Sequence, residues 1–233
     1  MTAATEKSQE RRIPLSRERV LEAAVELADE QGLEALSMRN LAERLGVKAM
    51  SLYNHVANKE AILDGVIDAI VHEIAMSSGG FEVAGEPAEW KANLRDRVLS
   101  ARKVMLRHRW APTLFETRTR MSPTLIVYFD KLLGILIEGG FSYDLAHHAM
   151  HALGSRALGF NQELFVPDSD EDDAEADAML AKMAEQLPYI VGMMQAISHE
   201  GPDTTLGWCD DQTEFEFGLD LLLDGLDRRL AAD

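Results

Sequence analysis

Apolar residues recur every three or four positions along almost the whole chain, which is the period of one face of an α-helix. The longest uninterrupted stripe consists of Ile62, Leu63, Val66, Ile67, Ile70, Val71 and Ile74. The sequence shows neither the strict alternation of a half-buried strand nor an internal repeat. Only 6% of the residues are aromatic, and the apolar residues are mostly Leu, Ala, Ile and Met. Because these aliphatic residues suit helices, the sequence predicts an all-α protein.

Capping residues, glycines and prolines divide this pattern into segments. Ser16 and Ser37 are predicted N-caps, and Gly32 and Gly46 are predicted C-terminal stops. The predicted helices cover approximately residues 17–31, 38–45, 49–55, 59–76, 90–109, 122–138, 142–165, 177–199 and 212–231. The fifth of these is expected to stop near Ala111-Pro112. The polar residues 1–13 are predicted to be disordered, and the acidic run DSDEDDAEAD is predicted to be a solvated loop rather than a metal-binding or interaction tail.

Two short predicted helices, residues 38–45 and 49–55, meet at a turn that contains Gly46. One helix precedes them and a longer one follows, which is the arrangement of a helix-turn-helix unit. Small or apolar residues suit the crossing of the two helices, and Ala42, Val47 and Leu52 occupy those positions. Small or polar residues on the outer face of the second helix suit a major groove about 12 Å wide. A surface helical hairpin without such a role is the alternative interpretation.

The charge distribution fits a local nucleic-acid-binding surface on an acidic protein. The chain has 40 acidic and 23 basic residues, a formal net charge of −17. Residues 1–60 hold nine basic and ten acidic residues, whereas residues 61–233 hold 14 and 30. Surface charges more than about 8 Å apart are largely screened at physiological salt. The acidic remainder therefore disfavours non-specific binding to DNA, but it leaves a specific basic surface within residues 36–59 able to act.

A specific motif carries a family resemblance. The pattern Leu41-Ala-x-x-Leu45-Gly46-Val47, followed by Leu52-Tyr53-x-His55-Val56-x-Asn58-Lys59, resembles the DNA-binding segment of the tetracycline-repressor (TetR) family of bacterial regulators. The segments around Trp90, Gly140-Phe141 and residues 215–219 resemble, more weakly, the C-terminal domain of the tetracycline-repressor branch. The resemblance covers most of residues 15–231. It implies a three-helix DNA-binding domain in residues 1–60 and a ligand-binding and dimerisation domain in residues 61–233.

The resemblance and the helix-turn-helix pattern together predict the residues that contact DNA. Arg39 is expected to read a base edge from the start of the second helix, and Lys59 is expected to meet a phosphate. The predicted contact residues are Arg39, Lys48, Ala49, Met50, Ser51, Tyr53, Asn54, His55 and Lys59. Ala49 and Met50 replace polar or rigid residues of tetracycline repressors, so the operator sequence is not transferred. A surface ion pair with Glu43, four residues further on, is the alternative role for Arg39.

The C-terminal helices are expected to enclose a small-molecule inducer. Its predicted contacts are Trp90, Arg97, Phe115, His151, Met193 and Met194. Ordinary core packing is the alternative for the methionines. Tetracycline repressors bind the drug as a magnesium chelate with a histidine ligand in the segment after the fifth helix, where this chain has Phe115. A phenyl ring offers no lone pair to a hard cation.

The same alignment leaves only weak candidates for holding magnesium. Glu163 matches a carboxylate position of the family, and His108 would replace Phe115 if the alignment shifted. One carboxylate alone makes a weak magnesium site. The prediction is therefore a metal-independent, largely apolar or aromatic inducer with no cofactor.

No catalytic motif is present, so the chain is predicted not to be an enzyme. His147 and His151 stand at positions i and i+4 of one helix, a spacing that can bind a transition metal. Because no cysteine or third ligand lies nearby in the sequence, polar lining of a cavity or interface is the favoured interpretation, and no metal site is predicted. An all-α sensor of small molecules or metals that does not bind DNA tightly is the alternative function.

The last helix predicts the mode of assembly. Phe215, Leu219, Leu222, Leu223 and Leu226 share one side of it. The family resemblance implies that this helix pairs with the helix at 142–165 in the four-helix bundle of a homodimer, whereas the helix taken alone could simply close the core. The sequence has one cysteine, no signal-peptide pattern and no apolar stretch of 18 residues,. We therefore predict a cytoplasmic, homodimeric repressor that binds a palindromic DNA operator and is released by a small-molecule inducer.

Overall fold

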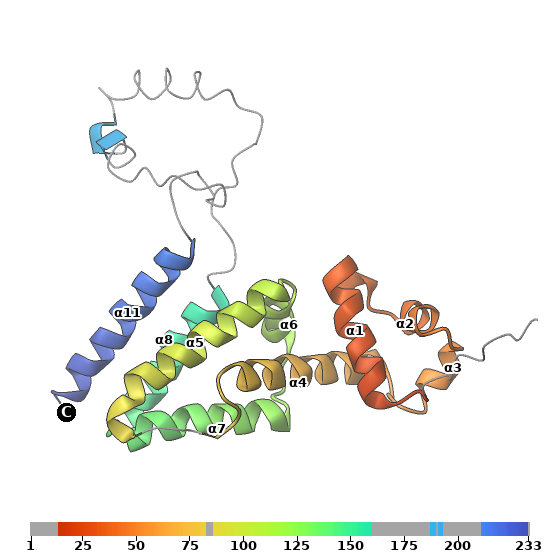
Figure 1. Ribbon diagram of the computed structural model, residues 1–233, viewed down its shortest axis with the longest axis horizontal. Helices are drawn as coiled ribbons and strands as arrows, with labels where there is room; N and C mark the ends of the chain where they lie inside the picture. Colours follow the sequence, from red (N-terminus) through yellow and green to blue (C-terminus); the bar gives the residue numbers. More distant parts are fainter. Residues whose placement is uncertain (1–13, 83–85, 160–186, 190, 193–210, 233) are drawn as a thin grey trace, which may run out of the picture. The chain divides into compact units, whose positions relative to one another are not determined.

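The computed structural model describes residues 14–82, 86–159, 187–189, 191–192 and 211–232 (Figure 1). Every regular element within these residues is helical, which confirms the all-α prediction. The α-helices are α1 (Arg17–Gln31), α2 (Met38–Leu45), α3 (Ala49–Leu52), α4 (Lys59–Ser77), α5 (Trp90–Arg107), α6 (Ala111–Thr117), α7 (Pro123–Glu138), α8 (Tyr143–Gly159) and α11 (Asp211–Leu230). In the described part of the chain, no helix is long and apolar enough to cross a bilayer.

Side-chain caps fix the starts of the first helices where the sequence predicts them. The Ser16 Oγ accepts a hydrogen bond from the backbone N–H of Arg19 at 3.2 Å, and the Ser37 Oγ accepts one from Asn40 at 3.1 Å. The Asn58 Oδ1 likewise accepts the N–H of Ala61 at 2.9 Å, within the first turn of α4. These bonds satisfy N–H groups that the first turn of a helix leaves without partners. The predicted N-caps Ser16 and Ser37 are confirmed.

Two predicted helix boundaries are wrong. α3 ends at Leu52, because the N–H groups of His55 and Val56 both donate to the Leu52 carbonyl and turn the chain toward α4. The segment after α5 continues as α6, although the sequence analysis placed only a stop there. Pro112 lies in the first turn of α6, where its missing N–H breaks no helical hydrogen bond, so it begins a helix rather than ending one.

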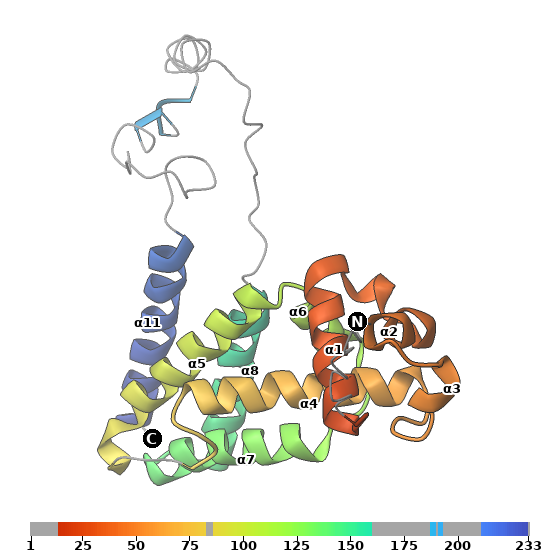
Figure 2. The ribbon, with the colours of Figure 1, turned by 45° about the vertical axis from the view of Figure 1, so that its right-hand side comes forward.

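The chain divides into two compact units. The first comprises residues 1–73 and 107–126, and the second comprises residues 74–106 and 127–233. In the first unit α1 precedes the two short helices α2 and α3 (Figure 2). The predicted domain boundary after residue 60 falls in the first turn of α4 and remains a prediction. Residues 1–13, the acidic run, Met193 and Met194, for which the sequence makes predictions, lie outside the described residues, as do nearly all of the predicted helix at 177–199 and the end of the one at 142–165.

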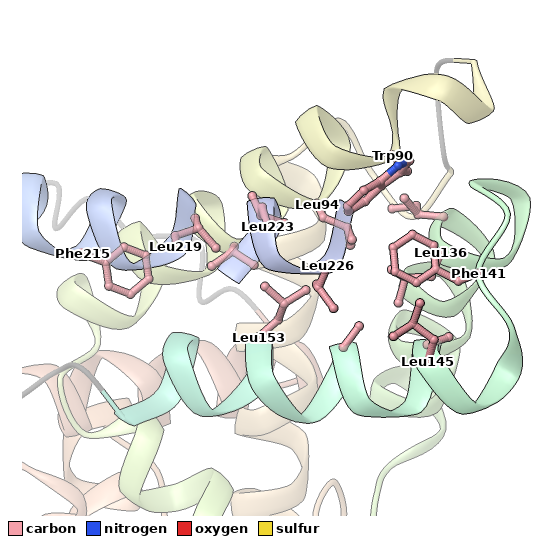
Figure 3. Packing of buried hydrophobic residues seen from close by; sticks show 14 residues of the cluster. Trp90, Leu94, Leu136, Phe141, Leu145, Leu153, Phe215, Leu219, Leu223 and Leu226 are labelled. Atoms are coloured by element: carbon pink, nitrogen blue, oxygen red, sulfur yellow. The ribbon is translucent and has the colours of Figure 1, made fainter. Parts of the chain in front are cut away.

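The second unit is built around one cluster of buried side chains from α5, α7, α8 and α11 (Figure 3). Trp90 and Phe141 meet edge to face, with ring centroids 4.7 Å apart. Phe215 is fully buried between two guanidinium groups, those of Arg102 and Arg156, whose Cζ atoms lie 4.3 and 4.8 Å from the ring centroid. Such contacts add a favourable cation–π attraction to the burial of the ring.

The inner side of α11 belongs to this cluster. The prediction that this side forms the dimer interface is therefore wrong for the residues buried there. Phe215, Leu219 and Leu223 are each 0% exposed within the single chain, and they cannot also form a dimer interface. Ion pairs flank them and fix the position of α11 against α5: Arg95 binds Glu216 at 2.6 Å and Asp220 at 2.7 Å, and Lys91 binds Asp224. Four residues of the apolar stripe identified in the sequence, Phe215, Leu219, Leu223 and Leu226, belong to the core, whereas Leu222 is half-buried and lies outside the cluster.

The outer side of α11 carries its own large apolar side chains. Phe217 is 63% exposed and Leu221 is 58% exposed. They stand four residues apart, so they lie one above the other on the helix surface. Two neighbouring apolar side chains exposed to water do not stabilise a monomer. A surface of this kind suits contact with another chain.

Candidate DNA-binding and ligand-binding sites

The candidate DNA-binding surface is formed by α2, the turn at Gly46 and α3. Gly46 adopts a left-handed conformation with φ 64°, and the N–H of Val47 donates to the Ala42 carbonyl at 2.9 Å. A residue with a side chain disfavours this φ, so glycine stabilises the sharp turn between the two helices. Leu41, Ala42 and Leu52 are buried beneath the turn. The predicted core role of Leu52 is confirmed, since its side chain is fully buried.

The predicted DNA-contacting residues are mostly solvent-exposed around α3. Met50 is 75% exposed and Tyr53 is 47% exposed, which is unusual for large apolar side chains on a protein surface. Seven of the nine predicted contact residues are exposed, Met50 and Tyr53 among them, and two are half-buried. The exposed residues are Arg39, Lys48, Ala49, Met50, Tyr53, Asn54 and Lys59, and the half-buried ones are Ser51 and His55. The surface therefore presents both hydrogen-bonding and apolar groups to a partner.

The arginines of α2 have different environments. Arg44 binds two carboxylates of α1, Glu26 at 2.9 Å and Glu30 at 2.7 Å, and its hydrogen bond lowers the pKa of Glu30. Arg44 therefore joins α2 to α1. Arg39 is exposed and has no ion pair with Glu43 or with any other described residue. The alternative role for Arg39, a surface pair with Glu43, does not occur, and its guanidinium is available to a ligand.

A second group of polar contacts, which the sequence analysis did not identify, fastens residues 107–118 to α1 and α4 within the first unit. The buried His108 places its Nδ1 2.7 Å from the Asp29 Oδ1 and its Nε2 3.1 Å from a Glu73 carboxylate oxygen. Trp110 donates its indole N–H to the same Asp29 oxygen at 2.7 Å. Both ring nitrogens of His108 are thus occupied by carboxylates of this chain.

The other end of this segment has a similar attachment. Arg118, directly after α6, binds Glu60 at 2.6 Å and also binds Asp64, both in the first turns of α4. The two carboxylates raise the pKa of the Arg118 guanidinium, chiefly through the hydrogen bond that Arg118 donates to Glu60. Residues 107–118 are therefore fastened to α4 at both ends and to α1 at one end.

Two of the predicted inducer contacts have well-defined places in the second unit. Trp90 is only 5% exposed and packs in the central cluster. Arg97 is equally buried, and it donates to the carbonyls of Gly80 at 3.2 Å and Glu82 at 2.9 Å, in the connection between α4 and α5. Both side chains have structural partners within the chain. The contact of Trp90 and Arg97 with an inducer remains a prediction.

The remaining predicted contacts are more dispersed. Phe115 is half-buried on α6 in the first unit, and His151 is exposed on α8 in the second. The sequence analysis did not single out Tyr128 of α7 as a candidate contact, although its side chain is only 7% exposed. Burial raises the pKa of the Tyr128 phenol, and the nearby positive charge of Arg97 partly offsets this rise. Its phenol therefore stays neutral and can donate a hydrogen bond. No group of three or more His, Cys, Asp or Glu side chains in the described part of the chain could hold a metal ion.

Two family models match complementary parts of the chain. Residues 20–66 match the tetR family of bacterial regulatory proteins, and residues 84–230 match the tetracyclin repressor-like C-terminal domain. The first match contains α2, the Gly46 turn and α3. The second contains α5 to α8 and all of α11, and four of these helices, α5, α7, α8 and α11, contribute the central cluster of the second unit.

Whole-chain relatives agree with these matches. The class A tetracycline repressor from Escherichia coli transposon 1721 is 30% identical over 90% of this chain and 89% of its own length. The class C repressor from Escherichia coli is 28% identical over 92% of this chain and 91% of its own. The structure of ActR from Streptomyces coelicolor in complex with actinorhodin has a TM-score of 0.69 and 27% identity, covering 94% of this chain and 99% of that one. The chain belongs to the TetR family, and it is a DNA-binding, ligand-responsive transcriptional regulator.

Proposed function

We propose that this regulator is a repressor that binds a palindromic operator as a homodimer, with α3 in the major groove, and that a small-molecule inducer releases it. The observation that carries this proposal is the exposed surface of α2 and α3, where Arg39 lacks any ion-pair partner among the described residues. The exposed Arg39 guanidinium has the chemistry to read guanine edges, and the exposed Met50 and Tyr53 have the chemistry to contact thymine methyl groups,. The protein then has no catalytic role, and it acts in the cytoplasm, where its DNA lies.

Arg39 and Lys59 are expected to contribute to binding in different ways. A guanidinium can donate two hydrogen bonds to O6 and N7 of guanine, a contact worth about 1–3 kcal/mol of discrimination. Lys59 is exposed at the start of α4, and an ammonium that meets a phosphate contributes equally to all sequences,. Base-specific affinity and salt dependence therefore separate the two roles.

Arg39→Ala should weaken operator binding by about 1–3 kcal/mol and relax the preference at one base pair in each half-site. Lys59→Ala should weaken binding to operator and scrambled DNA alike, and it should reduce the slope of log K against log salt by about 1 per contact. The measurement is a gel shift with the DNA upstream of the chain's own gene and with each single-base operator variant. Equal base preferences in the wild type and Arg39→Ala would refute the Arg39 assignment.

Arg44→Ala is the matched control. It removes an identical positive charge from the same helix, but Glu26 and Glu30 hold the wild-type guanidinium against α1. We expect Arg44→Ala to leave the base preferences unchanged. Exposed ion pairs of this kind contribute little to stability, so the variant should remain folded.

The outer side of α11 supports the proposed dimer interface. Phe217 and Leu221 are exposed there, while the inner side of the helix is already buried in the cluster. In an isologous dimer the same surface of each subunit meets its copy, so two apolar side chains per subunit provide four at the interface. This assigns the predicted homodimer contact to Phe217 and Leu221 in place of the inward-facing leucines.

The environment of His108 supports a metal-independent inducer. Sequence reasoning left His108 as a substitute for the metal-binding histidine of tetracycline repressors. In the structure both of its ring nitrogens contact carboxylates, those of Asp29 and Glu73. Both nitrogens therefore face carboxylates of this chain rather than an inducer-bound cation, and Phe115 has no lone pair to offer one,. The inducer is therefore expected to bind through apolar and hydrogen-bonding contacts.

Tetracycline with magnesium should fail to release the regulator from operator DNA at micromolar drug. The measurement is fluorescence anisotropy of labelled operator during titration with the drug, with and without EDTA. The class A repressor from Escherichia coli provides the positive control under the same conditions. Release that EDTA abolishes would show that the chain holds a magnesium chelate after all and would contradict the metal-independent assignment.

The contacts of residues 107–118 offer a physical route for the inducer signal. This segment contains Phe115, and it is fastened to α4 through Arg118 and through His108, which also contacts α1. A ligand that moves the segment moves these attachments, and it shifts the equilibrium only by its different affinity for the two arrangements. The resulting change in the separation of the two DNA-binding surfaces of a dimer would break their match to the operator.

A further inference from the structure

The guanidinium of Arg97 is a buried positive charge that contacts only neutral groups. Arg97 is 5% exposed on α5. It donates to the Ser78 Oγ at 3.4 Å and to the carbonyls of Gly80 at 3.2 Å and Glu82 at 2.9 Å. In the part of the chain that the structure describes, no carboxylate forms an ion pair with it. Because removing a charge from water is costly, buried charges in proteins are normally paired with an opposite charge. Arg97 lacks that counter-ion.

The carboxylate of Glu82 does not fill this role. Its side chain is 89% exposed, and its Oε2 lies 3.9 Å from the Nζ of Lys131 on α7. Only the backbone carbonyl of Glu82 accepts from Arg97. Arg95, two residues earlier on α5, shows the usual arrangement, since it binds two carboxylates of α11. The same helix thus pairs one arginine with acids and leaves the more deeply buried one with neutral acceptors.

Tyr128 of α7 is a second buried polar group in the same region of the second unit. It stands three residues before Lys131, so both side chains share one side of α7, and Lys131 lies near the same segment that Arg97 binds,. Tyr128 is 7% exposed, and its hydroxyl makes no hydrogen bond to a described residue. Burial raises the pKa of this phenol, and the charge of Arg97 is near enough to oppose the rise. A donor without an acceptor therefore lies near a cation without a counter-ion.

We propose that Arg97 and Tyr128 bind an acidic group of the inducer, which is then an aromatic or apolar carboxylate. This inference rests on the proposed inducer-released repressor and names the chemical class of its ligand. A carboxylate accepts hydrogen bonds from guanidinium and phenol donors together, and it supplies the missing negative charge. Both side chains are buried within one chain, so the inference does not depend on which surfaces the homodimer covers.

The test is isothermal titration calorimetry of the full-length protein with 2-naphthoate and anthracene-9-carboxylate. The neutral carboxamides of the same two acids are the matched probes. Acid and amide have nearly the same shape, so the ratio of their affinities isolates the contribution of the charge. We expect the wild type to bind the acids roughly 10–100-fold more tightly than the amides, the range of a hydrogen bond to a charged group.

Arg97→Gln should abolish this preference, because glutamine keeps a hydrogen-bond donor but loses the charge. Arg97→Lys should retain a weaker preference, since it restores the charge without the planar fork of donors. Tyr128→Phe should weaken binding of the acids about threefold to tenfold. Arg107→Gln is the matched control: it makes the same change on α5 at an exposed arginine that binds Glu73 at 2.8 Å, and it should leave the preference unchanged. Circular dichroism will show which variants remain folded.

Equal affinity of the wild type for acid and amide would overturn the site, as would a preference that persists in Arg97→Gln. Absence of saturable binding of either acid to the wild type would also refute it. If Arg97→Gln does not fold, a full preference and full affinity in Arg97→Lys and Tyr128→Phe would decide against the site. None of these titrations includes DNA. A protein that binds operator without preferring acids refutes this inference alone, and one that prefers acids through Arg97 without binding operator refutes the repressor function alone.

Discussion

Leu221→Asp should convert the dimeric regulator into a folded monomer that no longer binds operator tightly. Leu221 is 58% exposed on the outer side of α11 in the single chain, so the substitution leaves the core intact. At the proposed interface the same carboxylate would be buried without a partner, which costs about 3–5 kcal/mol. That energy corresponds to roughly a 10²–10⁴-fold loss of dimer affinity. Sedimentation equilibrium measures the mass, and circular dichroism measures the helix content.

Leu219→Asp is the matched control for this prediction. Leu219 lies two residues earlier on the same helix, but its side chain is 0% exposed and belongs to the central cluster. The same new charge should therefore unfold the second unit, with a loss of helical signal, and should not yield a folded monomer. A Leu221→Asp protein that sediments as a wild-type dimer would refute the assignment of the outer side of α11 to the interface.

Trp90→Ala should lower the free energy of unfolding by about 3–5 kcal/mol, the usual cost of removing a buried tryptophan or phenylalanine side chain. Trp90 is 5% exposed, and it packs edge to face against Phe141 at 4.7 Å. The β-carbon and ring of Trp90 also approach Gly139 so closely that a side chain there would collide with them. The cavity left by the substitution cannot easily close, because α5 and the end of α7 are fixed by other contacts of the cluster,.

Urea unfolding at constant protein concentration measures this effect. Tyr143→Ala provides the control: Tyr143 is also a large aromatic residue of the second unit, but it is 78% exposed, and its removal should change the stability by no more than about 0.5 kcal/mol,. If Trp90→Ala instead has the stability of the wild type and loses only its response to inducer, the ring lines the ligand site and does not support the core.

Local features of the chain are predictable from the sequence because their causes lie within a few residues. The caps at Ser16 and Ser37 and the glycine turn at Gly46 follow from hydrogen bonds and backbone preferences that span three to five positions. The exposed positions of α3 follow from the same short-range pattern. The family motif adds the roles of individual residues, and the role of Arg39 as a DNA contact stays a prediction until it is measured.

Contacts between distant segments are not predictable in this way. His108 meets carboxylates 79 and 35 residues away, and Arg118 meets carboxylates 58 and 54 residues away. No periodicity in a single sequence specifies such partners.

The inner side of α11 shows the same limit. Hydrophobic periodicity identifies the side that leaves water, but it does not say whether that side packs against the same chain or a second one. Phe217 and Leu221 lie outside the main apolar stripe of the helix. Two apolar residues alone are too weak a pattern to predict a second contact surface from the sequence.

The most direct test of the proposed function is a DNase footprint of the wild-type protein on the DNA upstream of its gene, with Arg39→Ala at the same concentration beside it. We expect the wild type to protect two half-sites related by a two-fold axis, with centres about one or two helical turns, roughly 34 or 68 Å, apart. Arg39→Ala should lose this protection at concentrations where the wild type is saturated. A single protected half-site, or a footprint that is unchanged in Arg39→Ala, would contradict the proposal that a dimer reads the operator through α2 and α3.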